Sequence, residues 1–414
     1  MAKMMGRRPE IQRTRPAGSA PVAGRRSDHP RGAHTGRQLV LLSEGAAPGA
    51  VGMLRRASGI RLALASDFGT SYGNRPSRGE GIFFEALGAA LVHADPEQAR
   101  WLARQAPAGA LRVEPERYVR GAELRQPFTG TPLGAWSLAA TGVISSRYSG
   151  SGVRVAVLDT GIDSGHPDFR ARSIVSQSFV AGLSADDRDG HGTFCAGIAC
   201  GPREPEGTPR YGVACGAELY VAKVLDDSAS GTDGDVIAGI DWAVRNECAV
   251  VSLSLGAPVL PGDAYPQLYE QAAARALRAG TLLLAPAGNT SQRPDTIEPV
   301  QHPANCPSIV AIGAVEPALG VAPFSNGGLN AGGGEVDLVA PGIAVLSSAP
   351  RPTLHRIASG TSTAAPCAAG IAALLAEACP GARGAALRAL LLACCAALPA
   401  PGRDVGAGLA RAPQ

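Results

Sequence analysis

The sequence has few of the features that mark several large classes of protein. It contains no apolar run of the roughly 20 residues needed to cross a membrane. Aromatic residues make up only 4% of the chain, and no Cys-x-x-Cys pair of the zinc-binding kind occurs. The formal net charge is +3, which is too small to indicate a nucleic-acid partner. We therefore expect no membrane span, no zinc site and no nucleic-acid ligand.

The first part of the chain also lacks the apolar segment of a secretory signal. Residues 1–37 contain Lys3 and eight arginines against only Glu10 and Asp28, and no apolar stretch follows the pair Arg7-Arg8. Pro, Gly and Ser are common there, while large apolar side chains are few. This composition predicts a disordered basic leader over residues 1–37.

The cysteines do not define a disulfide framework. All nine lie between Cys195 and Cys395, and an odd number leaves at least one unpaired. Their pairing cannot be derived from the sequence, and we interpret most of them as small buried apolar side chains. The 45% hydrophobic content is sufficient for a large core.

Apolar runs alternate with helical stretches over most of the chain. Two helices are expected at 235–245 and 265–279. Buried strands are expected at 153–158, 218–225, 249–254, 282–286 and 308–315. The alternation predicts an α/β fold with a mostly parallel central sheet and helices on both faces, which makes three layers.

The region before this domain predicts a smaller α+β unit. Helices are expected at 48–57 and at 95–105, the second with Asp95 as N-cap and Pro96 at its first position. Strands are expected at 38–43, 60–65, 81–92 and 110–114. The order strand, helix, strand, strand, helix, strand is that of a split βαβ, or ferredoxin-like, domain.

Three short segments with glycine-containing turns carry the chemistry. Segments 155–161, 189–193 and 359–366 contain Asp159, His191 and Ser362 in that chain order. Each residue alone has an ordinary structural explanation, as a strand-end acid, a histidine in a glycine turn and a helix N-cap. Together they are the residue types that convert a hydroxyl into a nucleophile, in the order Asp, His, Ser.

These motifs resemble those of the subtilisin-like serine proteases, over about residues 130–411. The resemblance implies that Ser362 is the nucleophile, that His191 is the general base and that Asp159 orients His191. It also implies an oxyanion hole formed by the Asn289 side chain and the Ser362 backbone N–H. Segments 336–342 and 404–409 resemble further signatures of the family.

The same resemblance implies a site for an extended peptide. Small apolar residues would line a pocket that favours an apolar or aromatic side chain before the cut bond. One binding edge would be formed at 229–231 and the other at 254–256. The residues expected to contact substrate are Ala229, Ser230, Gly231, Ser254, Leu255, Gly256, Ala285, Ala287 and Gly288.

The resemblance also implies a proenzyme. Segments 90–99 and 113–117 are similar in sequence to the propeptides of the family. We expect a leader at 1–37, a propeptide that acts as an intramolecular inhibitor at 38–118, a junction with the mature N-terminal segment at 119–149, and the peptidase domain at 150–411. The cut would fall between about residues 118 and 130.

Several neighbours of the motifs depart from the family pattern. Phe194 stands where the family has a second histidine, and Thr363 and Cys367 stand where it has Met and His. Cys195 lies four residues after His191, on the same helical face. Some relatives with a cysteine there are sensitive to thiol reagents, so we expect mercurials to impair this protein.

No cofactor is expected. Asp168, in the sequence His166-Pro167-Asp168, matches a residue that binds calcium in many relatives. The loop 201–211, which would complete that site, is rich in Pro and Arg and offers no obvious set of oxygen ligands. We therefore expect no well-formed calcium site at Asp168.

Two other functions are consistent with the motifs. The chain could be an inactive binding protein that retains the fold, or an esterase or acyltransferase that uses the same triad, although Ser362 lacks the Gly-x-Ser-x-Gly elbow. We expect a monomer whose partners are peptide substrates and its own propeptide. The compartment is left open, because secretion follows from the resemblance while no export signal is recognised.

Overall fold

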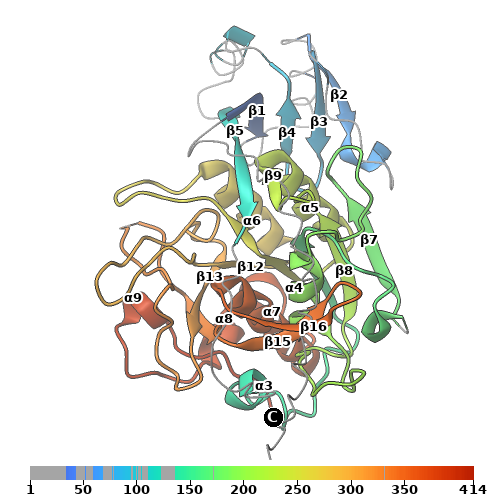
Figure 1. Cartoon of the computed structure of the whole chain (residues 1–414). Coiled ribbons are helices and arrows are strands. Elements are labelled where there is room, and N and C mark those ends of the chain that lie inside the picture. Colours follow the sequence, from blue (N-terminus) through green and yellow to red (C-terminus); the bar gives the residue numbers. More distant parts are fainter. Residues whose placement is uncertain are drawn as a thin grey trace, which may run out of the picture.

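The computed structural model describes residues 34–42, 52, 59–68, 77, 79–94, 97–98, 100, 104, 111–122, 136–170, 172–330 and 332–414. At its centre is a seven-stranded parallel sheet in the order β14-β13-β12-β10-β6-β8-β7 (Figure 1). Its strands are β6 (Arg154–Asp159), β7 (Ile174–Ser178), β8 (Glu218–Lys223), β10 (Val250–Leu253), β12 (Leu282–Pro286), β13 (Val310–Val315) and β14 (Leu338–Pro341).

Helices cover both faces of this sheet. On one face lie α4 (His191–Cys200) and α7 (Thr361–Ala378), with α8 (Gly384–Ala393) packed on α7; on the other lie α5 (Asp233–Arg245) and α6 (Gln267–Arg278). Alternate residues of β6 divide between the faces, because Val157 belongs to the core around α4 and α7 and Leu158 to the core around α5 and α6. The predicted three-layer α/β fold is confirmed.

Shorter elements connect and close the layers. The hairpin of β15 (Val345–Ala349) and β16 (Leu354–Ala358) precedes α7 and packs on α4. Three further short elements belong to this domain: α3 (Trp136–Ala140), the 3-10 turn η2 (Pro167–Phe169) and α9 (Gly402–Val405).

A second sheet is formed by the N-terminal part of the chain, in the order β5-β1-β4-β3-β2. Segment 81–92, expected as one strand, folds as an antiparallel hairpin of β3 and β4. The expected helices 48–57 and 95–105 lie almost entirely outside the described residues. The elements are β1 (His34–Leu42), β2 (Arg61–Leu64), η1 (Ala65–Phe68), β3 (Glu80–Phe84), β4 (Ala89–Val92) and β5 (Leu111–Gly121).

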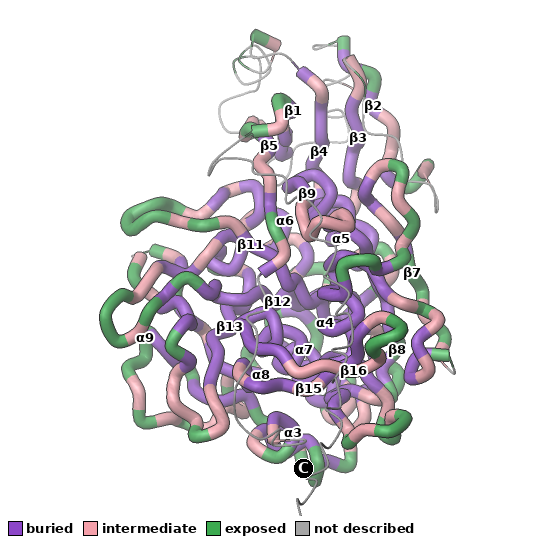
Figure 2. The backbone as a smooth tube through the Cα atoms, viewed as in Figure 1, coloured by how far each residue is buried: buried purple, intermediate pink, exposed green. Residues whose placement is uncertain are grey.

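One face of the N-terminal sheet packs on helices α5 and α6 (Figures 1 and 2). Leu39, Phe84 and Leu91 share one core cluster with residues of both helices. Polar groups reinforce the contact: Ala86 N–H donates to Asp241 Oδ1 at 2.9 Å, and the Arg275 guanidinium donates to backbone carbonyls of the sheet. The sheet is thus fixed against the larger domain by apolar and polar contacts.

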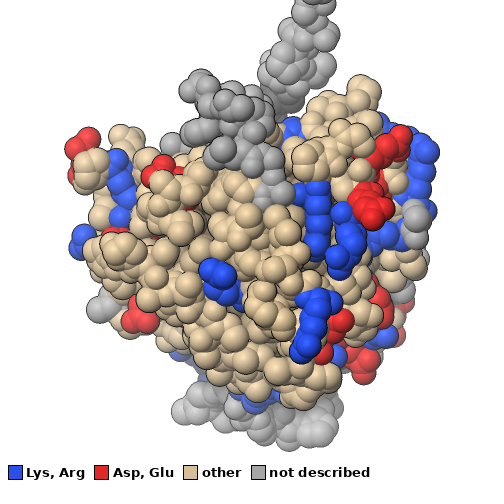
Figure 3. All heavy atoms as spheres, turned by 90° about the horizontal axis from the view of Figure 1, so that it is seen from below, with Lys and Arg blue, Asp and Glu red and all other residues tan. Residues whose placement is uncertain are grey.

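The surface is consistent with the small net charge. On the face in Figure 3 most atoms belong to uncharged residues, and basic and acidic groups are scattered among them. Among the described helices, none is both long and apolar enough to cross a membrane.

Candidate active site

The candidate site lies at the carboxyl edge of the parallel sheet, between β6 and β10. The connection that leaves β6 leads to β7 and β8 on one side, whereas the connection that leaves β10 leads to β12 on the other. Such a switch point opens a crevice beyond the strand ends, where open α/β sheets bind their ligands. Asp159 is the last residue of β6, so it lies at this edge of the sheet.

Asp159 and His191 form a buried pair. His191 Nδ1 lies 2.8 Å from both carboxylate oxygens, and Thr160 N–H donates to Asp159 Oδ1 at 2.7 Å. Burial by itself would lower the pKa of His191, but the Asp159 carboxylate outweighs burial and raises this pKa well above 6.5. The pair is therefore arranged to stabilise a positive charge on the imidazole ring.

A second buried acid, Asp187, holds the turn from which His191 projects. Its carboxylate accepts from Gly190 N–H at 2.8 Å, from the Thr193 N–H and hydroxyl, and from the Thr160 hydroxyl at 2.8 Å. Gly190 has φ of 98°, a conformation that favours glycine. Sequence reasoning did not identify Asp187, because an acid four residues before a histidine is not a distinctive pattern.

Ser362 lies in the first turn of α7 and is fully buried. In the described part of the chain its hydroxyl has no hydrogen-bond partner, which is unusual for a buried polar atom. The start of a helix also presents unpaired backbone N–H groups and the positive end of the helix dipole. An unsatisfied hydroxyl in such a field suits a group that bonds to a reactant.

Asn289 follows β12 and reaches the start of α7. Its side-chain oxygen accepts from the N–H and from the hydroxyl of Thr361, both at 2.8 Å. These bonds fix the orientation of the amide next to Ser362, with its oxygen directed toward Thr361. Thr361 is a residue of the site that sequence reasoning did not identify.

Strand β5 lies between the two expected binding edges. It pairs antiparallel with β9 (Ser230–Thr232) on one side and with β11 (Leu255–Gly256) on the other. Beyond these short strands, Gly121 N–H donates to the Ala229 carbonyl at 2.8 Å, and Ala122 N–H donates to the Ser254 carbonyl at 3.0 Å. The structure therefore holds an extended segment of the chain itself along residues 229–231 and 254–256.

This extended segment ends at the candidate site. The Ala122 carbonyl oxygen lies 2.9 Å from His191 Nε2, on the side of the ring opposite Asp159. Ala285 and Ala287 are fully buried at the end of β12, and Gly288 follows them, directly before Asn289.

The unusual neighbours of the motifs are buried with them. Cys195 Sγ lies 3.7 Å from His191 Nδ1 and donates to the Ser362 carbonyl at 3.5 Å. Burial raises the pKa of the Cys195 thiol. The Arg356 guanidinium lies over the Phe194 ring, 5.1 Å from the ring centroid. All nine cysteines are free thiols.

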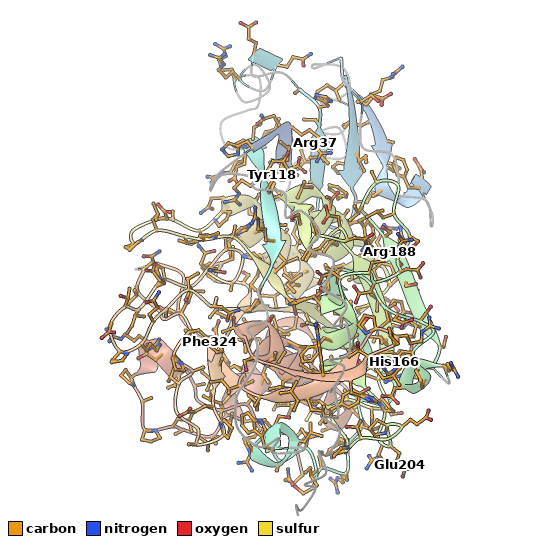
Figure 4. All side chains as sticks on the ribbon, viewed as in Figure 1. Arg37, Tyr118, His166, Arg188, Glu204 and Phe324 are labelled. Carbon is orange, nitrogen blue, oxygen red and sulfur yellow. The ribbon has the colours of Figure 1, made fainter. Side chains whose placement is uncertain are left out.

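The surroundings of Asp168 do not fit calcium. Its carboxylate accepts from Glu206 N–H at 3.0 Å and from the Tyr211 hydroxyl at 2.5 Å, and it lies 2.9 Å from His355 Nε2. His166 lies beside the β15–β16 hairpin (Figure 4), with Nε2 2.7 Å from the Leu354 carbonyl oxygen. Calcium requires six to eight oxygen ligands, whereas Asp168 is surrounded by hydrogen-bond donors.

A three-layer α/β fold, a buried Asp–His pair and an unsatisfied serine hydroxyl at a helix start are features that serine hydrolases combine. Residues 150–408 match the model of the subtilase family, Peptidase_S8, and the chain belongs to that family. It is 37% identical over 246 residues to subtilisin E of Bacillus subtilis, an alignment that covers 59% of this chain and 60% of that protein.

Other relatives are covered more fully. The chain is 37% identical over 246 residues to subtilisin of Bacillus pumilus, which covers 84% of that protein. It is 35% identical over 295 residues to M-protease of Shouchella clausii, which covers 70% of each chain.

Proposed function

We propose that this protein is a serine endopeptidase made as a self-processing proenzyme. The observation that carries the proposal is the position of strand β5. An extended segment lies between two edge strands, as a peptide substrate would, and brings the Ala122 carbonyl oxygen to 2.9 Å from His191 Nε2.

The proposed reaction proceeds through an acyl-enzyme. Ser362 Oγ attacks the carbonyl carbon of the substrate while His191 Nε2 takes the hydroxyl proton. His191 then gives this proton to the nitrogen of the departing amine as the C–N bond breaks. Water, activated by His191 in the same way, hydrolyses the ester and restores the Ser362 hydroxyl.

Two groups stabilise the charges that develop. Asp159, 2.8 Å from Nδ1, holds the His191 ring and stabilises the imidazolium. The Asn289 NH₂ and the Ser362 backbone N–H donate to the oxyanion of the tetrahedral intermediate. The bonds from Thr361 to Asn289 Oδ1 support this role, because they fix the amide before substrate binds.

Substrate recognition depends mainly on backbone hydrogen bonds. Residues 229–231 and 254–256 pair with the substrate on its two edges, as they pair with β5, so the sequence requirement is weak. Ala285, Ala287 and Gly288 accept the side chain before the cut bond.

The predicted propeptide, residues 38–118, extends in this proposal to residues 34–37, which were expected in a disordered leader but belong to β1, and to Ala122, which follows β5. The peptide bond after Ala122 is the one cut during maturation. Docking of the propeptide is supported by the buried Glu116, whose carboxylate pairs with Arg37 at 2.6 Å and accepts from Gly234 N–H, at the start of α5, at 3.0 Å. Arg37 and Tyr118 lie on β1 and β5 above α5 and α6 (Figure 4). Until it leaves, β5 excludes other peptides from both edges.

The test is peptide hydrolysis by the processed protein together with labelling by a fluorophosphonate. We expect cleavage of a peptide and a single label on Ser362, both lost in Ser362→Ala and retained in the exposed control Ser151→Ala. No label on a folded protein would favour the inactive binding protein. Turnover of esters without cleavage of the matched peptides would favour an esterase or acyltransferase.

A further inference from the structure

Arg117 of β5 makes a contact that the catalytic steps do not use. Its Nε lies 3.0 Å from Asp233 Oδ2, and its backbone N–H donates to the same oxygen at 3.1 Å. Asp233 is the first residue of α5, and its side chain is only 2% exposed. One carboxylate thus holds both the backbone and the side chain of residue 117.

His302 completes the surroundings of the guanidinium. Its Nε2 lies 3.3 Å from Arg117 Nη2 and 3.4 Å from Asp233 Oδ1, and its ring packs edge-on against Tyr269 at 4.4 Å between centroids. Burial and then Arg117 lower the pKa of His302 to about 4, so His302 is neutral and does not repel the guanidinium.

Asp233 is ionised in these surroundings. Burial would raise its pKa, but Arg117 and His302 lower it to about 2. A buried carboxylate needs a partner of opposite charge, because an unpaired buried charge is costly. Asp233, Tyr269 and His302 all lie in the family-matched region 150–408, so the pocket belongs to the peptidase domain and would lose its cation when the propeptide leaves.

The helix does not need Asp233 as its cap. Thr232 is the N-cap of α5, and its hydroxyl accepts from Asp235 N–H and donates to the Asp235 carboxylate. Asp235 thus accounts for the local capping interaction, whereas Asp233 faces the strand that occupies the binding cleft.

We propose that Asp233 and His302 form a subsite for a cationic side chain at the sixth residue before the cut bond, counting Ala122 as the first. This inference rests on the proposed peptidase function and names the class of substrate it prefers: extended peptides with arginine at that position. Shorter peptides whose N-terminus lies after this position do not use the subsite.

The test uses the full chain, expressed and allowed to process, and a series of peptides based on its own sequence. The acetylated peptides read Xaa-Tyr-Val-Arg-Gly-Ala-Glu-Leu, with arginine, norleucine or glutamate as Xaa. Norleucine keeps an unbranched apolar stem and removes the charge. The readout is the ratio of kcat/KM between peptides on one enzyme, so a general loss of activity in a variant cancels.

We expect the arginine peptide to be preferred over the norleucine peptide by about tenfold or more, mainly through a lower KM, and the glutamate peptide to be poorest. Asp233→Asn should reduce this preference to near one. The matched variant Asp235→Asn, which removes a carboxylate from the same helical turn, should retain it.

The outcomes separate the two proposals. Cleavage of all three peptides at equal rates by the wild-type protein overturns the subsite and leaves the peptidase function intact. A preference that survives in Asp233→Asn overturns the assignment to Asp233. Failure to cleave any of the peptides overturns the peptidase function, and the subsite with it.

Discussion

The carbonyl oxygen of Ala122 lies 2.9 Å from Nε2 of His191, although the two residues are 69 positions apart in the chain. Ala122 N–H also donates to the Ser254 carbonyl, so Ala122 is held through both its N–H and its carbonyl group. A segment in this position excludes an external peptide from the same backbone groups. The contact therefore links the proposed catalytic chemistry to the proposed inhibition by the chain's own N-terminal part.

Activity should fall on the acid side as His191 becomes protonated, because only the neutral ring can accept the Ser362 proton. Since Asp159 raises the pKa of His191, this fall should begin at a higher pH than for an ordinary histidine. Asp159→Asn should move the acid limb of the pH profile of kcat/KM to lower pH and reduce kcat by roughly 10⁴-fold. The exposed Asp189, which accepts from His191 N–H, provides a control: Asp189→Asn should change both much less. An unmoved acid limb in Asp159→Asn would contradict the assigned pair.

Removal of the Asn289 amide should slow turnover with little effect on KM. We expect a loss of roughly 100–1,000-fold in kcat for Asn289→Ala, a magnitude known from the corresponding donor of a subtilisin, a member of the same family. Asn289→Asp keeps the acceptor for Thr361 but removes the donor, so it should lose activity while melting near the wild-type temperature. Full turnover in Asn289→Asp would exclude Asn289 from the oxyanion hole.

His355 should stabilise the fold through Asp168. The Asp168 carboxylate would lose one of its three neighbours in His355→Ala, and we expect the free energy of unfolding to fall by about 1–3 kcal/mol. Burial opposes ionisation of Asp168, but the bonds from Tyr211 and His355 lower its pKa below 3.8. The stabilisation is therefore present above the ordinary Asp pKa and is lost as the pH falls through the lowered value.

The coupling free energy between Asp168 and His355 can be measured by denaturant unfolding of four proteins: the wild type, His355→Ala, Asp168→Asn and the double variant. The coupling should be the same with excess calcium and with a chelator, because the neighbours of Asp168 are donors. A coupling that appears only in the absence of calcium would indicate that the ion binds Asp168.

Modification of Cys195 should inactivate the protein. Its Sγ lies 3.7 Å from His191 Nδ1, so a mercury atom there would displace the ring from Asp159. Because Cys195 is fully buried and burial raises its pKa, the reaction should be slow. Loss of activity in mercurials should be absent in Cys195→Ala and unchanged in Cys379→Ala, which removes an exposed thiol. Full activity after complete modification of Cys195 would contradict this prediction.

Five strands of the central sheet, β6, β8, β10, β12 and β13, could be predicted because their signal is local, whereas β7 and β14 were not predicted. Segment 282–286 is apolar at every position, as a strand buried on both faces requires, and β12 has these bounds. The hairpin of β3 and β4 was not predicted, since both strands are apolar and the four residues between them include only one glycine as a turn signal.

The length of β5 could not be predicted from its own residues. The expected strand ended at 114, whereas β5 continues to Gly121 because it pairs with β9 and β11, which are more than a hundred residues away in the chain. The neighbours Asp187, Thr361 and His302 were missed for the same reason, because their roles depend on contacts between distant segments. The site residues Asp159, His191, Asn289 and Ser362 could be proposed because a family resemblance carries information that local pattern does not.

The most direct measurement is the mass and N-terminal sequence of the purified full-length chain after expression, for the wild type and for Ser362→Ala. The account predicts that the wild type is cut after Ala122, to give a new N-terminus at Glu123, and that Ser362→Ala retains the uncut junction while the control Ser151→Ala is processed normally. The same cut in Ser362→Ala, or an uncut wild type that is folded, would contradict it.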